Sequence, residues 1–369
     1  LGKVNTSAHH GYYDKAYLFA DVGVVGGGLG GIAAALEAAK SGAEVVLVDD
    51  GAALGGSLGY ARFGADGARG RVLAQELMAE LPDPPNIQIV SDAVCAGLFA
   101  DNWLAVVRGN RLYKMRAAAC VIAAGALEQP AVFRNNDLPG VMLGSAAQRL
   151  IRLYGVRPGR NAVVLSANAD GYGVALDLID AGVAVQAVVE LRERAAPDAA
   201  AAEVHRRGVR VVEGSAVTEA KTGTDGQKLG SALVARITGE GQCAPEQTAI
   251  DCDLLCMSVG YTPTAHLLHH AGAGFHYNRD TRMFEPSALP ARLYAAGSVA
   301  GCYGLDAVLA DGRRAGWEAA RDAGFRGSAE PTRPLSRGGE GLTHPWPIFP
   351  HPRGKDFVDY DEDLQVRDL

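Results

Sequence analysis

The sequence predicts an α/β fold made of two copies of one strand–turn–helix–strand unit, with the second copy inserted into the first. Apolar strand-like runs alternate with helical periodicity, a pattern typical of parallel strands covered by helices. One unit spans Val22–Asp49 and a similar unit spans Val163–Glu190. A late strand and turn at Ala291–Gly301, followed by a helix at Leu305–Ala323, are expected to return to the first unit.

The spacing within the two units supports an internal repeat. In each copy the last glycine of the turn precedes the glycine of the next break by the same interval, Gly31 to Gly42 and Gly171 to Gly182. Agreement of this kind over a strand, a turn and a helix predicts that both copies fold alike.

Composition excludes several classes of protein. The chain has 369 residues, 48% of them hydrophobic, and a net charge of −7, which disfavours nucleic-acid binding. No apolar run reaches the roughly 18 residues of a membrane span, and no secretory signal pattern opens the chain. Six scattered cysteines without a C-x-x-C pair favour reduced thiols and a cytoplasmic location. Because the first residue is Leu, we expect a fragment or a processed product.

The elements between and around the repeats follow from periodicity and turn residues. Strands are expected at "NIQIV", "AVCAGLF", "WLAVVRG", "LYKMRA", "CVIAAGA", "GVRVVEGSAV", "SALVARITG" and "DLLCMSVGYTP", and helices at Arg69–Leu81 and Ser145–Tyr154. The predicted domains are an N-terminal arm (1–20), a discontinuous first dinucleotide-binding domain (21–140 and 272–326), a second Rossmann-like domain (141–271) and a Gly/Pro-rich C-terminal arm (327–369).

The turn of the first unit has the G-x-G-x-x-G spacing of a dinucleotide site. Gly26 is expected to make the tight turn, Gly28 to let a pyrophosphate approach, and Gly31 to allow close packing of helix on strand. The helix N-terminus then offers N–H groups to the phosphates. Asp49 ends the second strand, where a carboxylate binds a ribose diol and repels a 2′-phosphate, which favours NAD or FAD over NADP. Asp50 is expected beside it.

In the second unit the corresponding turn has lost most of its glycines. Ser166 and Asn168 stand where the first two glycines would be, and only Gly171 is kept. Asp170 adds a negative charge, and Glu190 keeps the position of the ribose acid. We therefore expect a Rossmann-like domain with a degenerate nucleotide site. The alternative is an altered nucleotide or substrate site that uses Asn168 as a donor.

The order of motifs resembles two-dinucleotide-domain flavoprotein oxidoreductases. The matching stretches are "LGGS" (Leu54–Ser57), "AAG" (Ala123–Gly125), "SVGYTP" and "LYAAGSVAG". The resemblance implies that the following residues border the cofactor: Gly56, Ser57, Val94 (through its backbone, at adenine), Ala124, Gly125, Gly297 and Ser298.

Two departures separate this chain from that family pattern. The redox cysteines of its disulfide reductases are replaced by Leu58 and Phe63. The acid that binds the ribityl chain of FAD is replaced by Ser298, which puts FAD in question.

Three longer stretches resemble the alpha subunit of heterotetrameric sarcosine oxidases. They are "NRLYKMRAAACVIAAGALEQPAVFRNNDLPGVML", "YGVRPGRNAVVLSANADGYGVALDL" and "GKDFVDYDEDLQVRDL". The resemblance implies NAD in the intact site and sarcosine demethylation with oxygen on partner beta, gamma and delta subunits. It also implies ferredoxin-like and folate-binding domains outside this stretch. No catalytic residue is assigned to this chain.

Other interpretations stay open. A self-contained FAD enzyme acting on an opine, proline or another amine or imino acid is the alternative, and an NADH-dependent reductase is disfavoured by Asp170 and the missing cysteines. The histidines at 266, 269 and 270 are expected on a solvated helix face rather than at a metal, and no metal site is predicted. Cys252 and Cys256 are expected to pack on one face of a strand. The "NND" at 135–137 is expected to make a turn or to border a cofactor or an interface.

Overall fold

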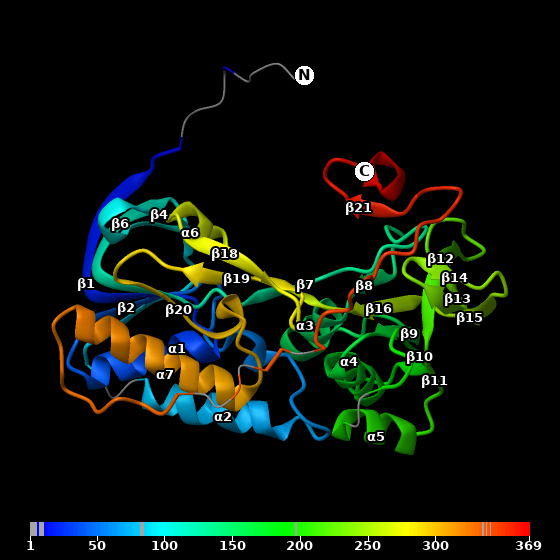
Figure 1. Cartoon of the computed structure of the whole chain (residues 1–369), viewed down its shortest axis with the longest axis horizontal. Helices are drawn as coiled ribbons and strands as arrows, with labels where there is room; N and C mark the ends of the chain where they lie inside the picture. The colour runs from blue at the N-terminus through cyan, green and yellow to red at the C-terminus, as the bar shows by residue number, and fades with distance from the viewer. Residues whose placement is uncertain are drawn as a thin grey trace.

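The computed structural model describes Thr6 and residues 11–81, 85–195, 198–333, 336, 338–339 and 341–369. The fold has two αβ units side by side, each built on its own sheet (Figure 1). The first sheet is mainly parallel and the second is wholly parallel. Predictions that fall on the other residues, including residues 1–5 and 7–10 of the N-terminal arm, lie outside the described part of the chain.

The first sheet combines a parallel half with an antiparallel half. In sheet order its strands are β3 (Ile87–Val90), β2 (Val45–Val48), β1 (Asp14–Val25), β6 (Arg111–Ile122), β5 (Trp103–Arg108) and β4 (Val94–Phe99), with β20 (Leu293–Ala295) beside β6. β4, β5 and β6 run antiparallel, and the other pairs are parallel.

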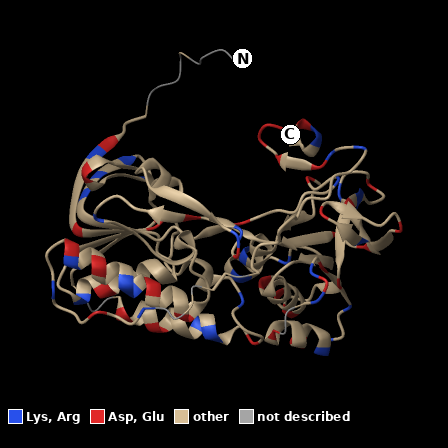
Figure 2. Ribbon diagram, in the orientation of Figure 1, with Lys and Arg blue, Asp and Glu red and all other residues tan. Residues whose placement is uncertain are grey.

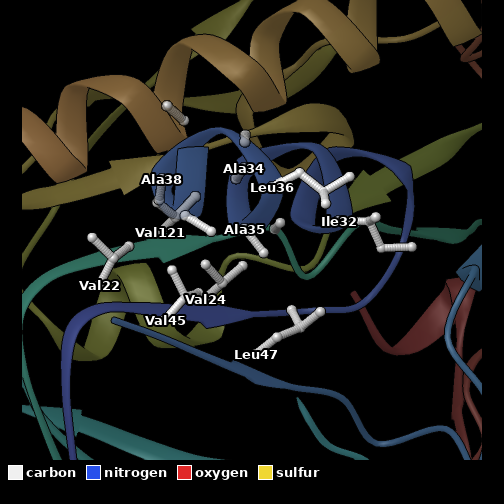
Figure 3. Close-up of a cluster of buried hydrophobic side chains, with 14 of the residues drawn as sticks. Val22, Val24, Ile32, Ala34, Ala35, Leu36, Ala38, Val45, Leu47 and Val121 are labelled. Carbon is white, nitrogen blue, oxygen red and sulfur yellow. The ribbon is translucent and has the colours of Figure 1, made fainter. Parts of the chain in front are cut away.

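Helices cover one face of this sheet and a small layer covers the other. α1 (Leu29–Lys40), α2 (Ala68–Glu80) and α7 (Leu305–Asp322) lie on the first face, and α6 (His266–His270) and the hairpin of β18 (Gly274–Asn278) and β19 (Met283–Ala288) lie on the second. Figure 3 shows the core between α1 and the sheet, where Ile32 and Leu47 are fully buried. Burial of each such side chain contributes about 1.5–3 kcal/mol to stability.

The second sheet is parallel throughout. Its order is β11 (Val211–Val212), β10 (Ala184–Glu190), β9 (Asn161–Ser166), β16 (Leu254–Ser258) and β8 (Val141–Leu143). α3 (Gly144–Tyr154), α4 (Ala169–Asp180) and α5 (Ala199–Arg206) pack on one face. The other face packs against β12 (Ser215–Thr222), β13 (Leu229–Gly239), β14 (Gln242–Cys243) and β15 (Thr248–Asp251).

A two-stranded ribbon joins the units. β7 (Ala126–Glu128) carries the chain out of the first unit, and β17 (Tyr261–Pro263), antiparallel to it, carries the chain back. The second unit therefore lies within the first along the sequence, which confirms the predicted α/β class with an inserted second unit.

The packing differs from the predicted domain limits in three places. Residues 14–20, assigned to the arm, belong to β1 because they pair in register with β6. Phe133 packs in a core of the second unit, and Leu268 of α6 packs in a core of the first. The boundary between the cores of the two units therefore lies at the β7–β17 ribbon, not at residues 140 and 271.

The C-terminal residues form three short elements. β21 (Phe357–Asp359) and β22 (Leu364–Gln365) form a small hairpin, followed by the short helix η4 (Val366–Asp368). Figure 2 shows acidic and basic residues interspersed along α7 and α2. Among the described residues, none of the helices is long and apolar enough to cross a bilayer.

Candidate functional site

The first glycine turn has the geometry that its spacing predicts. Gly26 follows β1 with φ +104°, and its N–H donates to Val48 O at 2.8 Å. A Cβ at Gly31 would lie 1.7 Å from Gly26 O, so only glycine lets the helix approach the strand this closely. A Cβ at Gly28 would meet nothing within 4 Å. The turn is therefore tight at its first and last glycines and open at its middle one.

The N-terminus of α1 carries no side-chain cap. Gly28 is the N-cap residue, and the first turn holds no acidic side chain. Such a helix end presents backbone N–H groups and a positive dipole end, which suits a phosphate group. The open position at Gly28 and this uncapped helix together fit a pyrophosphate.

Asp49 contacts the turn through its side chain. Its carboxylate accepts hydrogen bonds from the N–H groups of Gly27 and Gly51, the latter at 2.9 Å. Burial raises the pKa of the Asp49 carboxyl above its ordinary value, against the opposite effect of these two donors. Asp50 is exposed. Asp49 thus holds the shape of the turn at the end of β2, where a ribose diol would lie.

The other residues predicted to border the site are arranged around this turn. Gly56 begins the short helix η1 (Gly56–Gly59), and a Cβ there would lie 3.0 Å from the Cα of Gly28. Ser57 follows it and is exposed. The N–H of Ala93 donates to Asp49 O at 3.0 Å, which places the neighbouring Val94, the first residue of β4, beside the acid.

Two further segments complete the surroundings. Ala124 N lies 3.1 Å from where a Cβ of Gly26 would be, and Gly125 follows with φ +75° in open space. Gly297 and Ser298 belong to the short helix η3 (Gly297–Ala300), and a Cβ at Gly30 would lie 3.5 Å from Gly297 Cα. Residues from several separate segments therefore meet at one turn.

Sequence reasoning missed Asp311 of α7. Its carboxylate is buried, accepts a hydrogen bond from Gly297 N–H at 2.9 Å, and pairs with Arg314 at 2.9 Å. The signal was an acid on the buried side of a helix, three residues before an arginine. This carboxylate is engaged by the protein itself.

The second turn is closed by its own side chains. Ser166 occupies the space beside Gly171, because a Cβ at Gly171 would lie 2.4 Å from Ser166 Oγ. Asn168 caps α4 by accepting a hydrogen bond from Gly171 N–H at 3.2 Å. Glu190 accepts hydrogen bonds from Tyr172 at 3.1 Å and from the Arg192 guanidinium at 2.8 Å. The Glu190 carboxylate, which stands at the position of the ribose acid, is thus already bonded to groups of the protein.

Asp170 does more than place a negative charge at the turn, because its side chain is bonded to Tyr261. Tyr261 Oη donates to its carboxylate at 2.6 Å, and burial raises the pKa of Asp170. Burial and the neighbouring Asp170 also raise the pKa of Tyr261 well above its usual range. The phenol therefore stays protonated and donates a hydrogen bond to the Asp170 carboxyl group at the start of α4.

The histidines of α6 are exposed as expected, whereas two cysteines pack differently from the prediction. His266, His269 and His270 are all exposed, as predicted for a solvated helix face. His269 also stacks on Phe275 with ring centroids 3.8 Å apart, and His270 Nδ1 accepts from Leu98 N–H. Within the described ranges, no three His, Cys, Asp or Glu side chains are placed to hold a metal. Cys252 and Cys256 lie in different core clusters, because the strand begins only at Leu254.

The "NND" stretch lies against the C-terminal segment. Asn136 Nδ2 donates to Phe357 O at 2.8 Å, and Phe357 N–H donates to Asn136 Oδ1 at 3.1 Å. Arg134 donates to Gly354 O at 2.7 Å. Two stretches that carried the resemblance, 110–143 and 354–369, therefore contact each other.

Comparisons with known proteins agree with this geometry. A family model described as pyridine nucleotide-disulphide oxidoreductase matches residues 20–324. The chain is 32% identical to the alpha subunit of sarcosine oxidase from Corynebacterium sp. (strain P-1), over 100% of this chain and 40% of that protein. It is 26% identical to the A subunit of opine oxidase from Agrobacterium tumefaciens (strain Ach5), over 82% of this chain and 66% of that protein. The chain spans well under half the length of the sarcosine oxidase proteins that it matches.

Solved structures show the same fold. L-proline dehydrogenase from P. horikoshii superposes with a TM-score of 0.66 at 22% identity, covering 87% of this chain and 59% of that one. Thioredoxin reductase from T. acidophilum superposes with a TM-score of 0.61 at 19% identity, covering 83% and 97%.

Proposed function

Because the chain belongs to the pyridine nucleotide-disulphide oxidoreductase family, we propose that it is the dinucleotide-holding region of a sarcosine oxidase-like amine oxidase. The observation that carries this proposal is the contrast between one open glycine turn and one closed turn in the same fold. The chain holds a single dinucleotide at the first turn. The amine is oxidised with partner subunits, by oxidative demethylation of sarcosine with oxygen.

In this proposal Gly26, Gly28 and Gly31 hold the pyrophosphate and Asp49 holds a ribose. The remaining contacts come from the segments that surround the turn, namely Asp50, Gly56, Ser57, Val94, Ala124, Gly125, Gly297 and Ser298. A nicotinamide ring can accept a hydride, but the proposal assigns it no such step here. The positions of the family's redox cysteines hold Leu58 and Phe63, both of which belong to or pack on the first core.

NAD is favoured over FAD by the surroundings of Ser298. The sequence offers no acid at this position, and the nearby carboxylate of Asp311 already binds Gly297 N–H and Arg314. A flavin ribityl chain would therefore lack its usual acceptor at this end of the site.

The proposed partners are the beta, gamma and delta subunits of a sarcosine oxidase-like complex, and the proposed location is the cytoplasm. Similarity over the whole chain to the alpha subunits of sarcosine oxidases supports the first part. The six cysteines are free thiols, which suits a reducing compartment.

A second candidate is an FAD-dependent oxidoreductase of an opine, proline or another amine or imino acid. The similarity to opine oxidases favours it, since the chain covers 66% of one such protein but only 40% of a sarcosine oxidase relative. The discriminating feature is the cofactor itself.

The test is to denature the purified chain and identify the released compound by absorption spectrum and mass. Release of NAD without a flavin band is the expected result. Release of FAD would transfer support to the second candidate.

A matched pair of variants tests the assignment of the site. Asp49→Ala should reduce the retained dinucleotide strongly, and Glu190→Ala should leave it nearly unchanged, because Glu190 is bonded to Tyr172 and Arg192. Equal retention in both variants would refute the assignment of the site.

A further inference from the structure

A segment of the chain's own C-terminal region crosses the second unit where a nucleotide would lie. We call residues 341–349 the strap. In Figure 1 the strap belongs to the orange-red trace that passes from the middle of the molecule along the second unit toward the C-terminus. His344 N–H donates to Val259 O at 2.8 Å, and Tyr261 N–H donates to Thr343 Oγ1 at 3.1 Å. The strap therefore contacts the chain just beyond the carboxyl end of β16.

The strap also contacts the N-terminus of α4. Asn168, which is 1% exposed, donates from Nδ2 to Leu342 O at 2.9 Å. Its Oδ1 accepts from Gly171 N–H at 3.2 Å and from Ser258 Oγ at 3.3 Å. One end of the amide thus caps the helix, and the other end holds the strap.

The far end of the strap is fixed in the core. Val132 N–H donates to Pro347 O, and Phe349 N–H donates to Val132 O, both at 2.8 Å. Phe349 is 3% exposed and packs in a core cluster of the second unit. Apolar burial and paired backbone groups anchor the strap at this end.

In an open parallel sheet, ligands bind outside the carboxyl ends of the strands, at the N-terminus of the following helix. Asn168 and the chain after β16 are the groups at that place in the second unit, and both are bonded to the strap. We propose that the second nucleotide site has become a polypeptide-binding site, filled by residues 341–349 of the same chain. The ligand class is a peptide segment with a hydroxyl side chain, because Thr343 is buried and its Oγ1 accepts the Tyr261 N–H.

Gly260 fits this occupant closely. A Cβ on Gly260 would lie 2.7 Å from Thr343 Cγ2 and 3.1 Å from Thr343 Cα. Gly260 does not have a positive φ, so alanine fits its backbone, and its methyl group would press on the strap and lie 3.1 Å from the Gln129 side-chain oxygen. Gly239 of β13 is a matched control, because a Cβ there would meet its nearest atoms at 3.6 Å, an ordinary contact.

The experiment is hydrogen–deuterium exchange of the full chain, followed by mass spectrometry. Unmodified protein should protect the amides of His344 and Phe349, which donate to Val259 O and Val132 O, and 1 mM NADH should leave the exchange of residues 166–173 unchanged. Gly260→Ala and Thr343→Ala should each speed exchange of the strap roughly tenfold or more, while β9 keeps its protection. Gly239→Ala should match the unmodified chain.

Three results would overturn the proposal. They are unprotected exchange of the strap in the unmodified protein, protection of residues 166–173 by NADH, or unchanged strap exchange in both variants. The cofactor released from the first turn is a separate readout, so failure of the proposed function would not be mistaken for failure of the strap.

Discussion

Gly28 and Gly31 lie three residues apart and differ in what a methyl group would meet. At Gly31 a Cβ would lie 1.7 Å from the Gly26 carbonyl oxygen, whereas at Gly28 the space is open. Gly28 also has a φ of −78°, which alanine adopts freely. Gly31→Ala should therefore lower the free energy of unfolding by about 3 kcal/mol. Gly28→Ala should change it by about 1 kcal/mol or less, yet abolish dinucleotide retention.

Urea unfolding of both variants, with the retained dinucleotide measured in parallel, checks this contrast. Similar losses of stability in the two variants would show that the turn is not built as described. A Gly28→Ala protein that retains its dinucleotide would show that this face of the turn is not the binding face.

The local geometry of the first turn was predictable because it depends on the spacing of nearby residues. The three glycines and Asp49 follow from one motif, and the structure gives each glycine the expected surroundings. The role of Asn168 was not predictable, because its amide donates to a carbonyl 174 residues away. The asparagine in place of a glycine was visible in the sequence, but the Leu342 carbonyl that accepts its hydrogen bond was not predictable.

At the scale of elements, one buried ion pair joins the two units. Arg62, in the loop after η1, donates to Asp177 of α4 at 2.8 Å, and their side chains are 4% and 0% exposed. Asp177 also accepts from Gln148 of α3 at 2.9 Å. Asp177 also pairs with Arg152 of α3, so removal of Arg62 takes away a buried charge-assisted hydrogen bond but does not leave Asp177 without a cation.

Arg62→Ala should therefore lower the free energy of unfolding by about 2 kcal/mol. Arg69→Ala is the control, because Arg69 and its partner Asp306 have side chains that are 63% and 79% exposed. An exposed pair of this kind contributes about 0–1 kcal/mol. Thermal or urea unfolding of the two variants checks the difference, and equal effects would mean that the junction of the units does not depend on this pair.

Most of the central strands and helices of both units were predictable from periodicity, but α5, β8, β15 and the β18–β19 hairpin were not, and neither was the start of β1. Residues 14–20 alternate between the two faces of the sheet, but Tyr17 and Phe19 are the exposed members, at 67% and 73%. Large apolar side chains on the solvent side hide the usual strand pattern, in which one face is polar. The pairing of this strand with β6 decides its structure, and that pairing joins residues far apart in the chain.

At the scale of the whole molecule, the inserted arrangement of two αβ units was predictable because the repeat leaves its spacing in the sequence. The path of the last segment was not, since residues 327–355 have no periodicity and their contacts are with distant backbone groups. Because of those contacts, the helix N-termini at the two glycine turns differ. The first helix N-terminus is uncapped and open, and the second is capped by Asn168 and covered by the strap.

The central claim is that one chain has one working dinucleotide site, and a count of NAD sites tests it most directly. Calorimetric titration with NAD, after removal of any dinucleotide carried through purification, should give one site per chain. That site should be lost in Gly28→Ala and kept in Asn168→Ala. Two sites per chain, or one site that survives Gly28→Ala and disappears in Asn168→Ala, would contradict the account.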